Sequence, residues 1–140
     1  MNVNEFRLGN KIMKFGIDYV GENPVVDRSD FEVIDVTIDV LKNINDFNGS
    51  IDYYYCEPVI LTEEWFLKFN FQKIGRNFRI WHDYGNGSRE FIVYYNSDSK
   101  KYELKASNYL YELKYVHQLQ NIYLDLSLCE LQFIENSTKP

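Results

Sequence analysis

The strongest constraint on the fold is a series of short strand-like segments between Phe71 and Leu113, separated by recognisable turns. The turn Asn86-Gly87 is a strong β-hairpin signal, because both residue types tolerate positive φ. Short connections of this kind join neighbouring antiparallel strands, so this part of the chain predicts an antiparallel meander. The expected strands are residues 71–74, 78–82, 89–96, 101–106 and 109–113.

A short helix is predicted over residues 62–70, immediately before the meander. Thr62 is a favourable N-cap, since its hydroxyl can accept a bond from a free backbone N–H. Leu61 and Phe66 have the spacing of a hydrophobic staple. Asn70 tolerates the left-handed conformation that ends many helices.

A second helix is predicted near residues 114–127, because apolar residues recur there at helical spacing. Residues 131–134 are expected to return to the sheet as a last strand, and residues 135–140 to form a polar tail. The apolar positions of this helix are Tyr115, Val116, Leu119, Ile122, Tyr123 and Leu126.

The N-terminal half is less regular. A short strand is expected over residues 11–15, and residues 16–29 are expected to form a loop. From Phe31 onward, a strand is predicted to run to Val40, with a bulge near Ile34-Asp35 where the alternation changes phase. A tyrosine-rich strand is expected over residues 51–56.

Length and composition favour one domain over residues 1–140, of α+β class, with a twisted, mainly antiparallel sheet and two helices. The net charge of −6 disfavours a nucleic-acid interface, which depends on many Lys and Arg contacts to phosphate. A local basic strip remains an alternative to ordinary solvated charges around a turn, formed by Lys68, Lys73, Arg76 and Arg79.

The two cysteines, Cys56 and Cys129, lie far apart in the sequence without a CxxC pair. We expect two free, buried thiols in a reducing compartment. The N-terminal residues are polar and no segment has the length of a membrane span, so we expect a soluble protein of a reducing cytoplasm with no membrane partner.

Catalytic and metal-binding motifs are not evident. The two histidines, His82 and His117, have no second ligand at metal-binding spacing, and no glycine pattern precedes a helix that could hold a phosphate. Glu63-Glu64 is interpreted as helix capping, because adjacent helical residues point in different directions. We therefore expect no enzymatic activity, no cofactor and no metal.

Exposed tyrosines and amides are the predicted partner-binding residues. Three consecutive strand residues cannot all face a core, so at least one of Tyr53, Tyr54 and Tyr55 should be exposed or cover an edge. The amides of the terminal helix can bond to a protein or to bases without net charge. The further candidates are Tyr94, Tyr95, His117, Gln118, Gln120 and Asn121.

The segments Leu61–Phe71 and Leu113–Tyr123 resemble a family of small, functionally uncharacterised proteins encoded by phages and mobile elements of Bacteroidota. This chain departs from the family pattern with Asn70 in place of glycine and with Leu128-Cys129 in place of Thr-Gly-Glu. The resemblance implies a phage or prophage accessory protein, and no catalytic motif accompanies it.

The most concrete function that the resemblance implies is inhibition of a host defence system. An anti-CRISPR protein that binds a CRISPR–Cas ribonucleoprotein effector, such as Cas13b, is the leading hypothesis. Two alternatives are a phage structural or replication-associated protein and an RNA-contacting protein that stacks bases on tyrosines.

Overall fold

The computed structural model describes residues 3–46, 55–83, 85, 87–106 and 108–134. These residues confirm the predicted α+β class, with strands arranged in two antiparallel sheets rather than one. The chain divides into two compact units. Unit 1 comprises residues 1–59 and 115–117, and unit 2 comprises residues 60–114 and 118–140. The single domain over residues 1–140 stays a prediction, since the division does not tell whether the units unfold together.

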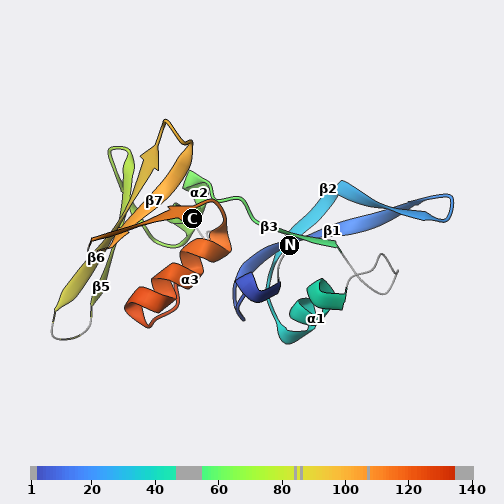
Figure 1. Ribbon diagram of the computed structural model, residues 1–140, viewed down its shortest axis with the longest axis horizontal. Coiled ribbons are helices and arrows are strands. Elements are labelled where there is room, and N and C mark those ends of the chain that lie inside the picture. The colour runs from blue at the N-terminus through green and yellow to red at the C-terminus, as the bar shows by residue number, and fades with distance from the viewer. Residues whose placement is uncertain (1–2, 47–54, 84, 86, 107, 135–140) are drawn as a thin grey trace, which may run out of the picture. The chain divides into compact units, whose positions relative to one another are not determined.

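Unit 1 is built on a three-stranded sheet in the order β2-β1-β3. Its first two strands form a long hairpin that extends beyond β3 (Figure 1). The loop predicted over residues 16–29 is wrong: these residues continue the hairpin, and Gly21 takes the positive φ of +67° at its turn. The elements are a 3-10 helix at Val3–Glu5, β1 at Lys11–Val20, β2 at Asn23–Asp35 and β3 at Tyr55–Pro58.

The strand predicted to run to Val40 ends at Asp35, and helix α1 follows at Ile38–Asp46. The apolar residues after Asp35 fit helical spacing as well as alternation, and the Thr37 hydroxyl caps the helix by accepting a bond from the Val40 N–H at 3.3 Å. The helix contributes to a small buried core that contains Phe6, Ile12, Val36, Val40 and Cys56, with Ile34, Leu41 and Ile44 packed against it.

Unit 2 contains the predicted meander as a five-stranded sheet in the order β4-β5-β6-β7-β8. All neighbouring strands are antiparallel and follow one another in the sequence, as the short turns predict. The strands are β4 at Gln72–Ile74, β5 at Asn77–Asp83, β6 at Ser88–Asn96, β7 at Lys101–Ala106 and β8 at Tyr109–Leu113.

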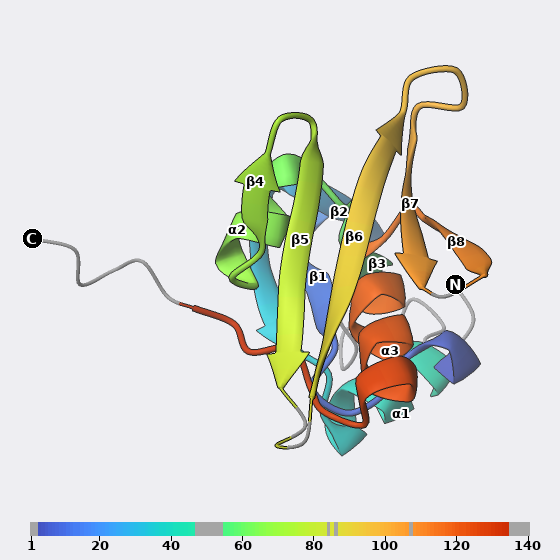
Figure 2. The same ribbon diagram turned by 90° about the vertical axis from the view of Figure 1, so that its left-hand side faces the viewer.

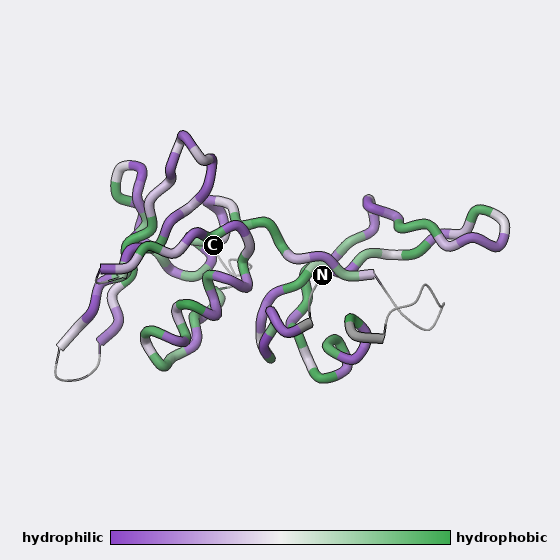
Figure 3. Tube along the Cα trace, in the orientation of Figure 1, coloured by the Kyte–Doolittle hydropathy of each residue, from purple (hydrophilic) through white to green (hydrophobic). Residues whose placement is uncertain are grey.

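Two helices cover one face of this sheet, here called the inner face (Figure 1). They are α2 at Glu63–Lys68 and α3 at Val116–Ser127, of which residues 118–127 belong to unit 2. Phe66 of α2 stacks on Phe78 with ring centroids 4.6 Å apart, and Tyr123 of α3 packs 5.1 Å from Phe91. Hydrophobic stretches lie between hydrophilic ones along these strands (Figure 3).

The ends of α2 match the sequence only in part. Asn70 adopts the predicted left-handed conformation, with φ of 67°, whereas the extended residue Thr62 makes no side-chain capping bond. The last strand predicted at residues 131–134 does not form. Instead, Leu131 is buried and the Ile134 N–H donates a single bond to the Lys68 carbonyl.

Candidate functional site

The outer face of the unit 2 sheet, opposite α2 and α3, carries aromatic and charged side chains from three adjacent strands. The strand register places Arg79 of β5 opposite Ile92 of β6, and Ile92 opposite Lys105 of β7. Trp81 and Tyr94 lie two residues from this row, on the same face, because side chains alternate along a strand. These five residues are called the Trp81 face below. Figure 2 shows this side of the sheet turned toward the viewer.

Trp81 is the most conspicuous residue of this face, since 48% of its surface is exposed. Ile92 is half-buried and lies diagonally across from Trp81, and the half-buried Tyr94 lies on the far side of the Arg79–Ile92 row. The same sheet face thus carries a tryptophan, an arginine and a tyrosine, the residue types that dominate binding energy at protein interfaces.

One ion pair borders Trp81 on this face. An Arg79 guanidinium nitrogen (Nη1) lies 3.9 Å from a Glu90 carboxylate oxygen, and the buried Arg79 Nε–H has no hydrogen-bond partner among the described residues. Glu90 in turn lies directly opposite Trp81. The face therefore presents a tryptophan bordered by a fixed carboxylate and a partly buried guanidinium.

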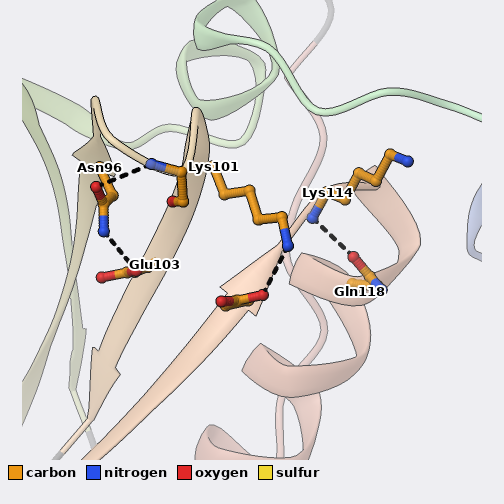
Figure 4. A network of polar contacts seen from close by, with 7 residues as sticks. Asn96, Lys101, Glu103, Lys114 and Gln118 are labelled. Carbon is orange, nitrogen blue, oxygen red and sulfur yellow. Dashed lines mark hydrogen bonds and ion pairs between the residues drawn. The ribbon is translucent and has the colours of Figure 1, made fainter.

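Polar contacts brace the neighbouring strands (Figure 4). The Asn96 amide donates to Glu103 at 3.1 Å, which joins β6 to β7, and the Lys101 ammonium donates to Glu112 at 3.0 Å, which joins β7 to β8. These pairs are exposed or half-exposed, so each contributes little to stability, but together they fix side-chain positions at the rim of the face.

The predicted tyrosines are distributed over different surfaces. Tyr94 lies on the Trp81 face, whereas Tyr95 lies on the inner side of the sheet, 47% exposed and 5.1 Å from the Tyr102 ring. Tyr53 and Tyr54 lie outside the described residues. Tyr55 belongs to unit 1. Of the proposed tyrosines that the structure describes, Tyr94 is the one that lies on the Trp81 face.

Tyr55 takes part in an aromatic and ionic cluster on the unit 1 sheet. The Phe15 ring lies 5.9 Å from Tyr55, and the Arg28 guanidinium carbon lies 5.3 Å from the Phe15 centroid. Arg28 donates two bonds to Glu57, at 2.7 and 3.1 Å, and the Tyr55 hydroxyl donates to the same carboxylate at 2.8 Å.

The Arg28 bonds are the largest cause that lowers the pKa of the Glu57 carboxyl, and the Tyr55 hydroxyl lowers it further. In return, bonding to Glu57 raises the pKa of the Tyr55 hydroxyl. Near neutral pH, Glu57 is therefore ionised and Tyr55 is protonated, as the hydrogen bond between them requires.

The amides of α3 are largely engaged in the fold. The Gln118 side-chain oxygen accepts a 2.8 Å bond from the Lys114 N–H, which links the residues before α3 to its first turn (Figure 4). Gln120 and Asn121 are half-buried, and each has an interaction within the protein. These three residues offer less free hydrogen-bonding capacity than the sequence suggests.

The expectation that His117 lies on a solvated face is wrong. Its side chain is only 1% exposed, and its ring lies 4.2 Å from Phe6 and 5.7 Å from Tyr115. Neither ring nitrogen has a hydrogen-bond partner among the described residues, and Nε2 lies 3.8 Å from the Glu5 carboxylate. Burial lowers the pKa of His117, while the Glu5 charge partly opposes this effect.

The other reactive side chains have structural surroundings. His82 Nδ1 lies 3.2 Å from the Tyr123 hydroxyl, and burial raises the pKa of the Cys56 thiol to about 11. Cys129 is exposed, contrary to the prediction that both thiols are buried. Within the described residues, no three His, Cys, Asp or Glu side chains are grouped so that they could hold a metal ion.

The strip of basic residues predicted as an alternative is neutralised at three positions. Lys68 pairs with Glu64 at 3.2 Å, Lys73 pairs with Glu63, and Arg79 pairs with Glu90 as described above. Glu63 and Glu64 therefore form ion pairs with lysines, in addition to occupying the first turn of α2.

No family model, curated protein or solved structure matches this chain. None of the described helices combines the length and the apolar character needed to cross a membrane. The interpretation of the Trp81 face therefore depends on its own chemistry. The sequence signal for it is visible in retrospect: Phe78 and Ile80 alternate with Arg79 and Trp81, so both faces of β5 carry large side chains.

Proposed function

We propose that this protein acts by binding a partner protein through the Trp81 face. The proposal depends mainly on Trp81, which is 48% exposed on a sheet face that no described helix of unit 2 covers. A partner that covers Trp81 and Tyr94 removes aromatic surface from water, which is a main source of interface energy.

The rigidity of the sheet supports binding at this place. Strands β5, β6 and β7 are paired on both sides, so the backbone under the Trp81 face is already ordered. Binding then costs little further conformational entropy, which favours affinity for a given contact area. Charges border the face at Arg79, Glu90 and Lys105. They help to orient the bound partner more than they increase its affinity.

The specific form of the proposal is an inhibitor of host defence that binds a CRISPR–Cas effector such as Cas13b. Its support is the resemblance of segments 61–71 and 113–123 to mobile-element proteins, together with the net charge of −6. An acidic protein is attracted to a basic ribonucleoprotein channel, and such attraction raises the rate of association.

An RNA-contacting role is the alternative from another class. Single-stranded RNA binding combines stacking on exposed aromatic rings with a basic groove. Trp81 and Tyr94 satisfy the first requirement, but the carboxylates that pair with Lys68, Lys73 and Arg79 weaken the second. A phage structural or replication-associated role also uses protein binding and differs only in the identity of the partner.

A pull-down from host lysate, with and without nuclease, tests the proposal. We expect the tagged protein to retain one protein partner after nuclease treatment, and the double variant Trp81→Ala, Tyr94→Ala to lose it. Loss of the partner with nuclease alone would instead support the RNA-contacting role. Retention of the partner by the double variant would rule out the Trp81 face.

A further inference from the structure

The outer edge of strand β2 is the second surface of this protein with the properties of a binding site. In the order β2-β1-β3, strand β2 pairs with β1 alone among the described residues, and it is 13 residues long. An unpaired edge of this kind presents backbone N–H and C=O groups that can pair with another strand. Most β2 side chains are exposed, so this edge is accessible in unit 1.

A bulge divides this edge into two straight parts. The register of β2 with β1 changes between Phe15 and Gly16, which leaves residues 28–30 without partners in the ladder. The Asp27 carboxylate holds the bulge by accepting bonds from the Ser29 N–H at 3.0 Å and the Ser29 hydroxyl at 2.6 Å. The part from Phe31 to Asp35 keeps an unbroken register with β1.

The part from Phe31 to Asp35 has a supported backbone. Its partner residues on β1 are 11–15, and residues 12–15 of that segment pair with β3 on their other side. Strand addition to this part would therefore extend an existing three-stranded sheet, rather than an isolated hairpin, which is a poor template.

The exposed side chains of this part differ between its two faces. Phe31 is 55% exposed and Val33 is 38% exposed, and both lie on the face that carries the Phe15 ring, 6.2 Å from Phe31. Glu32 lies on the other face, where its carboxylate is 4.0 Å from the Lys14 ammonium. An added strand would meet Phe31, Val33 and the Lys11-paired Asp35 on one face, and Glu32 and the half-buried Ile34 on the other.

The charge of β2 determines which strand can pair with it. The strand carries four carboxylates, from Asp27, Asp30, Glu32 and Asp35, and one guanidinium, from Arg28, for a formal charge of −3. The net negative charge of β2 disfavours the pairing of two copies of this strand, because like charges repel. A partner strand with basic residues would instead gain from the same charges.

We propose that the β2 edge at Phe31–Asp35 binds an extended segment of a partner protein in which apolar and basic residues alternate. The apolar residues would pack against Phe31 and Val33, and a basic residue would lie opposite Glu32. Backbone pairing supplies affinity in such strand addition, and the alternate side chains supply specificity. This inference depends on unit 1 alone and not on the Trp81 face.

A blocked peptide of alternating valine and lysine tests the proposal on the protein of residues 1–140. Binding is measured by fluorescence anisotropy and by NMR amide shifts. The control peptide has the same charge and a central proline, which prevents strand pairing. The test variant is Glu32→Lys, and the matched control is Asp98→Lys, which makes the same charge change in the turn after β6.

We expect saturable binding of the alternating peptide, with shifts concentrated at residues 31–35 and little binding of the proline peptide. Glu32→Lys should weaken binding about fivefold or more, while Asp98→Lys should leave it within about twofold. Equal binding of both peptides would show charge attraction without strand pairing. That result would overturn the proposal, as would the absence of binding, shifts centred elsewhere, or concentration-dependent dimerisation through β2.

Discussion

The two units use aromatic residues in opposite ways. In unit 2, rings from the helices and the sheet fill the inner face, and Phe66 alone contacts Phe71, Phe78 and Tyr102. In unit 1, the buried core is small, and the Phe31 ring on the β1–β2 hairpin is largely exposed. The same composition thus gives a densely packed sheet in one unit and an exposed strand surface in the other.

This difference indicates where stability and binding reside. Unit 2 can leave Trp81 in water because its inner face, with two helices, buries enough apolar surface to hold the sheet. Unit 1 has one α-helix of its own and a long hairpin. A smaller part of its backbone is therefore buried and protected from hydrogen exchange. We expect unit 1 to open more readily than unit 2 under native conditions.

The largest loss of stability is expected when an aromatic side chain is removed from the core of unit 2. Phe66→Ala removes a fully buried ring and should cost about 3–5 kcal/mol. Hydrogen exchange should then accelerate through residues 77–96 of unit 2, whereas residues 11–20 of unit 1 should change little. The matched variant Ile12→Ala, at a fully buried position of unit 1, should give the reverse pattern at about 2–5 kcal/mol.

Equal acceleration in both units from either variant would contradict the comparison. It would show that the units unfold as one cooperative structure, which is the behaviour expected of a single domain over residues 1–140.

A pH-dependent effect is expected from His117 in unit 1. The pKa of His117 is lowered from 6.5 in the folded protein, so the unfolded chain binds the proton first as the pH falls. The stabilising contribution of neutral His117 is complete above pH 6.5 and is lost as the pH falls from there toward the folded pKa.

His117→Phe keeps an aromatic ring between Phe6 and Tyr115 and should remove this contribution to the pH dependence of unfolding. Glu5→Gln should strengthen the dependence, because it removes the charge that favours the protonated ring. Urea unfolding of the three proteins between pH 7 and pH 5 measures the difference. Parallel curves for wild type and His117→Phe would show that His117 does not contribute.

Backbone strain is a property of unit 2. All three non-glycine residues with positive φ in the described chain belong to it: Asn70, Lys100 and Leu128. Leu128 has a φ of 60° and is 83% exposed, so its side chain contributes little packing to offset the strain. Leu128→Gly should stabilise the protein by about 1 kcal/mol, seen as a rise of about 2–4 °C in melting temperature. A lower melting temperature would show that the leucine side chain matters more than the backbone.

The smallest effects are expected at the two helix caps. Thr37→Ala in unit 1 removes a capping bond to Val40 and should cost about 0.5–2 kcal/mol. Thr62→Ala in unit 2 should cost less than about 0.5 kcal/mol, since the Thr62 hydroxyl makes no such bond. Denaturant titration of both variants measures the difference, and a larger cost at Thr62 would reverse it.

The sequence predicted unit 2 better than unit 1, for a physical reason. The turns of the meander and the helical spacing of α3 are local signals that tertiary contacts do not override. The segment from Val36 to Val40 satisfies both strand and helix periodicity, and its burial against Ile12 and Cys56 decides the outcome. The periodicity of so short a segment does not distinguish a helix from a strand.

The candidate site was only partly predictable. Tyr94 was named from its residue type, but the pairing of Trp81 with Glu90 depends on the strand register. His117 was misplaced because its polar character suggested a solvated face, whereas Phe6 and Tyr115 bury it. In both regions, contacts between residues far apart in the sequence determine where the side chain lies.

The most direct test of the proposed function is the affinity of single variants for the partner that the pull-down identifies. Trp81→Ala should weaken binding at least about 30-fold, as expected for loss of a central aromatic anchor worth about 2 kcal/mol or more. Tyr109→Ala removes a ring that is 68% exposed elsewhere on unit 2, and it should change the affinity less than about threefold. With melting temperatures unchanged, similar effects of the two variants, or none from Trp81→Ala, would contradict binding through the Trp81 face.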